Sequence, residues 1–185
     1  LETAEADIEF ADGNFVVAGT DKKISLMEVA QTSYKPGRTP VEMEPGLGAT
    51  FTYEAAKENF PNGCHACEVE IDPETGVIEI VSYKVVDDVG TVLTPLTLKG
   101  QIMGGVAHGI GQALLEEIQF DTESGQLVTG SFMDYTMPRA DDMSYIDVMS
   151  NPCPTATNPL GCKGAGEAGT VGAVPCVMNS VVDAL

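Results

Sequence analysis

A glycine-rich stretch late in the sequence holds the residue types best suited to chemistry. Residues 158–173 read NPLGCKGAGEAGTVGA, and their five glycines surround a single carboxylate, Glu167. Glycine permits positive φ angles and lets another group approach the backbone closely. Residues 174–185 have the apolar pattern of a helix, so Glu167 is expected in a glycine loop near a helix N-terminus. Such a place suits a reactive carboxylate or a bound anion.

Two other interpretations of this stretch need consideration. A glycine-rich run is also typical of a flexible loop. Residues 164–169 match the dinucleotide pattern G-x-G-x-x-G, but that fingerprint requires an apolar strand before it. The preceding residues 150–159 are rich in proline, which excludes a buried strand. A phosphate-binding P-loop is excluded as well, because Glu167 stands where the lysine is needed.

The composition limits the classes of partner. The 185 residues, enough for one domain or two small ones, carry a formal net charge of −19. A phosphate backbone attracts the opposite charge, so nucleic acid is a poor candidate; a solvated surface or a basic partner subunit fits better. No apolar run is long enough to cross a bilayer and no signal peptide is recognised, so we expect a cytoplasmic protein. The two ends of the sequence resemble cuts in a longer chain.

The close cysteine pair Cys64 and Cys67 is the second candidate site. A C-x-x-C spacing can be half of a zinc site or a redox pair, but the other three of the five cysteines are isolated. The pair lies in an alternating strand pattern, where residues three positions apart point to opposite faces. We therefore expect no metal or redox site there. His65 lies between them without an evident partner, which is typical of a structural histidine.

The first part of the chain, residues 1–45, is expected to be a peripheral segment. The dipeptide Asp12-Gly13 predicts a hairpin turn. Ser25 and Glu28 have the spacing of a capping box, which predicts a short helix to about Ser33. A proline- and glycine-rich connection follows, and an origin of this segment in a neighbouring domain stays open.

The remaining residues, 46–185, are expected to form one domain of the α+β class. Strands and helices are mixed in it without regular β-α-β alternation. We expect an antiparallel or mixed sheet with a glycine-rich helix and a C-terminal helix. The predicted strands cover residues 49–55, 64–71, 77–87 and 145–149, with a further hairpin at 118–120 and 126–131.

A helical period runs over residues 95–117, with an apolar stripe that includes Ile102, Val106 and Ile110. Each of the five glycines in this helix costs about 1 kcal/mol relative to alanine. Such a cost indicates close packing, either of a ligand or of another backbone, and both alternatives stay open. A second face combines polar side chains with glycine, which suits a polar ligand. It consists of Gln101, Gly105, His108 and Gln112.

Four stretches together resemble one family, the molybdenum hydroxylases that include xanthine dehydrogenase, aldehyde oxidase and the large subunit of carbon monoxide dehydrogenase. Each stretch alone is weak evidence, but the four stand in the order found in the family and span about residues 45–185. They are VDDVGTV at 86–92, GQIMGGVAHGIGQALLEE at 100–117, GSFMDY and MPRAD between 130 and 141, and the glycine loop at 158–169.

The resemblance implies a molybdenum–molybdopterin cofactor, expected in its cytosine dinucleotide form. In this family a carboxylate of the glycine loop acts as general base toward a hydroxyl ligand of molybdenum, and the activated oxygen attacks an electron-poor carbon. Glu167 occupies the position of the base, and Gln101 that of a glutamine that hydrogen-bonds the pterin. Gly105, Gly164 and Gly166 are assigned to cofactor binding by the same resemblance, and no residue is assigned as a metal ligand.

The intact protein is thus expected to hydroxylate an aldehyde or N-heterocycle oxidatively, or to oxidise carbon monoxide. Its partners would be the remainder of its own large subunit, flavin and iron–sulfur subunits or domains, and a small-molecule substrate. His108 stands where many relatives have glutamine and Thr94 where asparagine is usual, and neither concerns the base. The alternative is a non-catalytic scaffold or assembly domain, in which Glu167 only caps a loop.

The upstream part of such a large subunit would supply other cofactor contacts and much of the substrate pocket. We therefore expect these 185 residues alone to bind no molybdenum cofactor and to show no activity. Metal analysis of the purified chain is the measurement. Molybdenum at a stoichiometric level would contradict the expectation.

Overall fold

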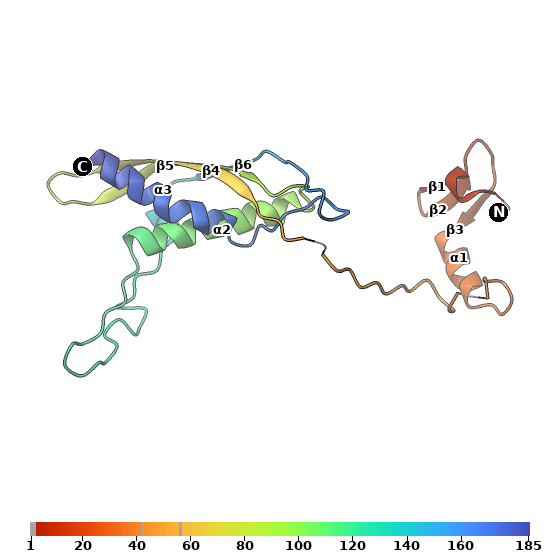
Figure 1. Ribbon diagram of the computed structural model, residues 1–185, viewed down its shortest axis with the longest axis horizontal. Coiled ribbons are helices and arrows are strands. Elements are labelled where there is room, and N and C mark those ends of the chain that lie inside the picture. Colours follow the sequence, from red (N-terminus) through yellow and green to blue (C-terminus); the bar gives the residue numbers. More distant parts are fainter. Residues whose placement is uncertain (1–2, 42, 56) are drawn as a thin grey trace. The chain divides into compact units, whose positions relative to one another are not determined.

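The computed structural model describes residues 3–41, 43–55 and 57–185, which belong to two compact units. Unit 1 is Leu1–Tyr53 and unit 2 is Glu54–Leu185. Each unit has a small sheet of its own and is described by itself (Figure 1). The division into segments 1–45 and 46–185 stays a prediction, and residues 1–2, 42 and 56 of those segments lie outside the described residues.

Unit 1 is a three-stranded antiparallel sheet followed by a short helix. The predicted hairpin forms at Asp12-Gly13, where φ is 49° and 74°. The predicted capping box is also confirmed, because Ser25 Oγ accepts from the Glu28 backbone N–H and Glu28 Oε2 accepts from that of Ser25. The elements are η1 (Glu5–Asp7), β1 (Ile8–Ala11), β2 (Asn14–Val17), β3 (Lys23–Ser25) and α1 (Leu26–Ser33).

The strand predicted for residues 49–55 is wrong. No residue of this segment lies in a strand of the described part of the chain, and all of its side chains are exposed. Phe51, the large apolar residue of the pattern, is 90% exposed. Alternation forms a strand only where a neighbour pairs with the backbone and a packed surface buries one face. The segment has neither.

Unit 2 has two layers, a three-stranded mixed sheet and two helices that pack on one face of it (Figure 1). The sheet order is β4-β5-β6, with β4 and β5 antiparallel and β5 and β6 parallel. The α+β class, the mixed sheet and the two helices are therefore confirmed. The elements are β4 (Asn62–Ile71), β5 (Ile78–Asp88), α2 (Pro95–Leu114), η2 (Ala140–Asp142), β6 (Ile146–Ser150) and α3 (Ala168–Ala184).

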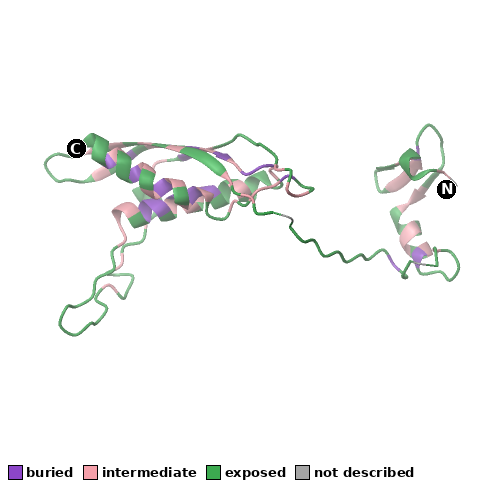
Figure 2. Cartoon of the chain, in the orientation of Figure 1, coloured by how far each residue is buried: buried purple, intermediate pink, exposed green. Residues whose placement is uncertain are grey.

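The apolar core of unit 2 lies between the sheet and the helices. The stripe predicted for α2 is buried, since Ile102, Val106 and Ile110 are at most 1% exposed. Figure 2 shows buried positions recurring along α2 and α3 on the sides that face each other and the sheet. The other core members come from β5, β6 and α3: Ile80, Tyr83, Val85, Ile146, Ala173 and Val177.

Helix α3 begins earlier than the sequence predicted, at Ala168 instead of residue 174. Much of the predicted glycine loop is therefore helical, and tertiary contact explains the difference. A Cβ at Gly169 would lie 2.9 Å from Val106 N, and one at Gly105 would lie 2.9 Å from Thr170 N. The two helices thus approach each other through glycine, and this packing outweighs the poor helix propensity of glycine.

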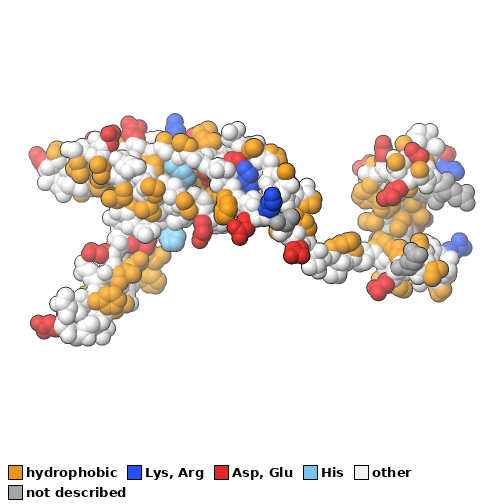
Figure 3. All heavy atoms as spheres, viewed as in Figure 1, with side chains coloured by type: hydrophobic (Ala, Val, Ile, Leu, Met, Phe, Trp, Pro, Cys, Tyr) orange, Lys and Arg blue, Asp and Glu red, His pale blue; other side chains and the backbone are white. Residues whose placement is uncertain are grey.

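An arm formed by residues 115–139 leaves α2 and returns to η2, and is coloured teal in Figure 1. The hairpin predicted there is reduced to one isolated bridge between Phe120 and Leu127, because no other strand of the unit pairs with it. The Tyr135 hydroxyl donates to Glu116 Oε2 at 2.5 Å and so links the returning part of the arm to its first residues. Hydrophobic side chains gather along the arm in Figure 3, and Phe132 is 88% exposed.

Gly105→Ala is expected to destabilise unit 2 by about 1–3 kcal/mol, because the added methyl group must push α3 away from α2. Gly104→Ala is the matched control. A Cβ at Gly104 would meet nothing within 4 Å, so this change is expected to stabilise the helix by up to about 1 kcal/mol. Denaturant unfolding of both variants and the unsubstituted protein is the measurement. Equal shifts for the two variants would contradict the packing role of Gly105.

Candidate functional site

Glu167 is the N-cap of α3, and its carboxylate is unengaged. Its side chain makes no capping hydrogen bond, and no other described residue forms an ion pair or hydrogen bond with it. Its backbone carbonyl accepts from Val171 N at 3.0 Å, which holds the residue at the start of the helix. The side chain is exposed. The structure thus places Glu167 at a helix N-terminus, as the sequence predicted.

Gln101 of α2 ties down the loop that precedes Glu167. Its Nε2 donates to the carbonyl oxygen of Gly166 at 2.7 Å. Thr170 Oγ1 donates to the carbonyl oxygen of Gly105 at 3.0 Å, one turn further along both helices. Three of the predicted site residues are therefore brought beside Glu167. Because the amide nitrogen of Gln101 is used within the protein, its Oε1 is the atom left to accept from a ligand.

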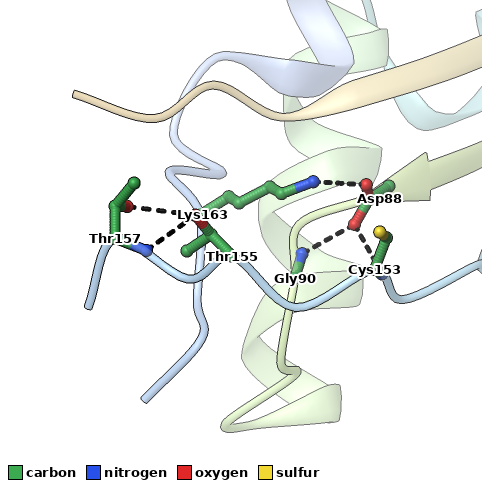
Figure 4. A network of polar contacts seen from close by, with 6 residues as sticks. All are labelled: Asp88, Gly90, Cys153, Thr155, Thr157 and Lys163. Atoms are coloured by element: carbon green, nitrogen blue, oxygen red, sulfur yellow. Dashed lines mark hydrogen bonds and ion pairs between the residues drawn. The ribbon is translucent and has the colours of Figure 1, made fainter. Parts of the chain in front are cut away.

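Asp88, at the end of β5, fixes the chain that leads into the glycine loop (Figure 4). Its Oδ2 accepts from Lys163 Nζ at 2.5 Å, and its Oδ1 accepts from the backbone N–H groups of Gly90 and Cys153 at 2.9 Å each. The hydrogen bond from Lys163, followed by those two N–H groups, lowers the pKa of Asp88 from 3.8 to about 2. Lys163 is thus paired with Asp88 and not with Glu167, its neighbour in sequence.

Backbone contacts reinforce this attachment. The carbonyl oxygen of Gly161 accepts from Thr91 N and Thr155 N, both at 3.0 Å, and Lys163 N donates to Val89 O at 2.8 Å. Gly161 has φ of 68°, which favours glycine. The approach to Glu167 is therefore held as a folded loop against the end of β5, which disfavours the interpretation as a flexible loop.

Glu167 lies on the wall between two cavities of unit 2. We call the first, of about 650 Å³, the α2 cavity, and the second, of about 610 Å³, the sheet cavity. Gly166, Glu167 and Val171 line both. The α2 cavity is lined in addition by the predicted polar face of α2 and its neighbours: Gly100, Gln101, Gly104, Gly105, His108, Gln112, Thr170 and Val174.

The glycines that line the two cavities fall into two kinds. A Cβ at Gly164 or Gly166 would meet nothing within 4 Å, and the same holds for Gly100 and Gly104, which the sequence did not assign to the site. These positions leave open space around Glu167. Gly105 lines the α2 cavity too, but its close contact with α3 leaves no room for a side chain, whether or not a ligand binds.

The sequence missed a buried polar cluster behind Glu167. His65 Nδ1 lies 2.7 Å from the Tyr83 hydroxyl, and His65 Nε2 lies 3.7 Å from Asp87 Oδ1. His65 and Asp87 both line the sheet cavity. A signal was present, since the alternation that buries Tyr83 and Val85 also places Asp87 on the inner face of β5.

The cysteine pair takes the predicted arrangement. Cys64 is exposed, whereas Cys67 is half-buried on the opposite face of β4. Within residues 3–41, 43–55 and 57–185, no group of three or more His, Cys, Asp or Glu side chains is placed to hold a metal ion. We assign no metal ligand to the described part of the chain.

Comparisons with known proteins find similar sequences and structures over this chain. Residues 1–144 match the family model described as molybdopterin cofactor-binding domain. The chain is 38% identical over 186 residues to subunit gamma of the 6-hydroxypseudooxynicotine dehydrogenase complex of Paenarthrobacter nicotinovorans, covering 100% of this chain and 23% of that protein. It is 36% identical over 185 residues to the carbon monoxide dehydrogenase large chain of Afipia carboxidovorans, covering 100% and 22%. Quinoline 2-oxidoreductase from Pseudomonas putida 86 matches with a TM-score of 0.88 at 38% identity, over 100% of this chain and 24% of that one.

This chain belongs to the molybdopterin cofactor-binding domain family. Its relatives are oxidoreductases of the molybdenum hydroxylase group, as the sequence motifs indicated. The chain spans about a quarter of the length of the curated relatives it matches. The family match ends before the glycine loop, whereas these relatives align over the whole chain, Glu167 included.

Asp88→Asn is expected to lower the stability of unit 2, with a defined pH dependence. The folded-state pKa of Asp88, about 2, lies below its ordinary 3.8, so its stabilising contribution is complete above about pH 4 and is lost as the pH falls through about 2. Denaturant midpoints of the variant and the unsubstituted protein should differ at neutral pH and converge near pH 2. A difference that stays constant down to this pH would contradict the role given to Asp88.

Proposed function

We propose that this chain forms part of the cofactor-binding large subunit of a molybdenum hydroxylase. The intact protein would oxidatively hydroxylate an aldehyde or N-heterocycle, or oxidise carbon monoxide. The observation that carries the proposal is the unengaged carboxylate of Glu167, held between two cavities by a fixed loop. The relatives named as carbon monoxide dehydrogenase and quinoline 2-oxidoreductase support this range of reactions.

The α2 cavity is the proposed place of the cofactor. When bound, molybdopterin with its metal, proposed in the cytosine dinucleotide form, supplies the oxidation of the substrate carbon and takes up the electrons. Gln101, Gly105 and Gly166, which line this cavity, are proposed contacts, and so is Gly164, which lines the adjoining sheet cavity. Gln101 Oε1 would accept from an N–H group of the pterin. The open space at Gly164 and Gly166 lets a flat polar group approach the backbone closely.

Glu167 is the proposed general base, which takes a proton from the attacking hydroxyl group onto a carboxylate oxygen. A base needs an accessible carboxylate that other protein groups do not occupy, and the side chain of Glu167 meets this condition. The backbone is held on both sides of it, through the Gly166 and Glu167 carbonyl oxygens. The carboxylate can therefore move only by side-chain rotation, which limits it to a few positions.

The scaffold alternative has weaker support. If Glu167 served only to cap the loop or helix, its carboxylate would accept a backbone hydrogen bond at the start of α3. No such bond is formed. The closed, glycine-lined face of α2 beside it would also have no purpose in a scaffold beyond packing, yet Gly100 and Gly104 pack against nothing.

The proposed partners are the remainder of the large subunit, flavin and iron–sulfur subunits or domains, and a small-molecule substrate. This chain covers only 23% of the length of a relative that is named as a subunit of a complex, which supports the remainder of the large subunit as a partner. Exposed apolar side chains such as Phe132 and Met133 on the arm support a covering partner. None of the described helices has the length and apolar character of a membrane span. A cytoplasmic location stays part of the proposal.

Glu167→Gln in the complete protein tests the role of the base. The amide keeps the shape of the side chain but takes up no proton, so turnover should fall by roughly 10²–10⁴-fold. Molybdenum content and the absorbance spectrum should stay unchanged, because Gln101 and the glycines are untouched. Glu79→Gln, on an exposed position of β5, is the control. Full turnover by Glu167→Gln with its cofactor bound would show the assignment to be wrong.

A further inference from the structure

The sheet cavity overlaps the proposed cofactor contacts only at Gly164 and Gly166. It shares Gly166, Glu167 and Val171 with the α2 cavity and has a volume of about 610 Å³. Residues 59–62, which lead into β4, form one wall, and residues 164–172 of the glycine loop and α3 form another. His65 and Asp87 line it from the inner face of the sheet. Pockets that bind small molecules have this size and a similar mixture of apolar wall and few polar groups.

Asp87 is the unusual member of this cavity. Its side chain is only 3% exposed, yet Oδ2 has no hydrogen-bond partner among the described residues. Oδ1 faces His65 Nε2 at 3.7 Å, which is longer than a hydrogen bond. A buried carboxylate without partners is costly, so native structures supply a donor from the protein, a water or a ligand. Here the described residues supply none, and Asp87 lines the cavity.

The surroundings hold Asp87 in this position. In the register of β4 and β5, Gly63 lies opposite Asp87, and a side chain at Gly63 would collide with Asp87 Oδ1. The Tyr83 hydroxyl lies 2.7 Å from His65 Nδ1, and burial raises the pKa of Tyr83. His65 Nε2 faces Asp87 Oδ1. The ring of His65 also lies under α3, where a Cβ at Gly172 would meet it at 2.5 Å.

The charges of the cavity define the ligand. Two carboxylates, Asp87 and Glu167, line it, and no lysine or arginine of the described residues does so. Carboxylates only accept hydrogen bonds when ionised, and they repel anions. The remaining wall is largely apolar, with Phe60, Pro61 and Val171. This combination matches an organic molecule that has an apolar body and a cationic N–H group.

We propose that the sheet cavity binds a small organic cation, with its protonated nitrogen at Asp87 and its apolar body against Phe60 and Pro61. Asp87 is thereby a specificity-determining residue for the substrate. The inference rests on the proposed function in one respect, because a molecule in this cavity lies beside Glu167 and becomes a substrate only if Glu167 is the base. Binding itself does not depend on that role.

Titration of the complete, cofactor-loaded protein with three matched probes tests the proposal. Benzylamine is cationic, benzyl alcohol is neutral and benzoate is anionic, on the same ring. Benzylamine should bind at least about tenfold more tightly than benzyl alcohol, and benzoate most weakly. Asp87→Asn should remove the preference for benzylamine. Glu68→Gln makes the same change of charge on the exposed outer face of β4 and should leave the preference for benzylamine unchanged.

Phe60→Ala keeps the test decisive if Asp87→Asn does not fold. Phe60 is 69% exposed, so its removal leaves the core untouched. The substitution should weaken the binding of benzylamine and of benzyl alcohol to the same extent, since both probes place their ring against Phe60. Unchanged affinity for both probes would overturn the proposal.

Two further outcomes separate this proposal from the proposed function. If the preference for benzylamine depends on Asp87 while Glu167→Gln retains full turnover, the cavity assignment stands and the general base is wrong. If the variants Asp87→Asn and Glu68→Gln bind benzylamine equally tightly, the cavity assignment is wrong. It is also wrong if a crystal grown with benzylamine shows only a fixed water at Asp87 Oδ2. Neither outcome affects the assignment of Glu167 as general base.

Discussion

The carboxylate of Asp88 is the contact on which the arrangement of the site depends. It accepts hydrogen bonds from its own strand end at Gly90, from Cys153 after β6, and from Lys163 before the glycine loop. Three segments distant in sequence are thereby joined at one point. A carboxylate with an ammonium and two backbone N–H partners makes strong, charge-assisted hydrogen bonds. Because the loop is held here, the position of Glu167 is determined by the sheet and not by the loop alone.

The second constraint is the close contact of α2 and α3 through glycine. It brings Gln101 within hydrogen-bond distance of Gly166 and sets the wall that separates the two cavities. Larger residues at Gly105 or Gly169 would separate the helices and move Glu167 away from the polar face of α2. The glycines of this protein therefore serve two purposes. Some permit the helices to touch, and others, such as Gly164, leave room for a ligand.

Much of the fold could be predicted from local patterns. The capping box at Ser25 and Glu28, the long strands of the β4–β5 hairpin and the apolar stripe of α2 are all present as predicted. Each of these depends on periodicity or on neighbours in sequence. The strand expected at 49–55 failed because alternation does not show whether a partner strand exists. The start of α3 was misplaced because glycine propensity does not show that Gly169 contacts Ile102 and Val106.

The site, too, was predicted only where local sequence motifs reveal it. Motifs in the sequence identified Glu167 and Gln101, and the structure brings them together, although their roles stay proposals. The polar pair His65 and Asp87 was missed because its members lie on different strands, and only the register between β4 and β5 brings them together. Asp88 was seen only as a strand end, because no local pattern reveals a pairing with Lys163, which is 75 positions away.

The parallel pairing of β5 with β6 has a consequence for how this domain is made. Parallel neighbours require a long crossover, and here it includes α2 and the whole arm. The β4–β5 hairpin can close as soon as its turn is synthesised, whereas β5 keeps one open edge until residues 146–150 leave the ribosome. An open edge invites pairing with other chains. The part of the domain that carries the site is thus also the part most exposed to misassembly during synthesis.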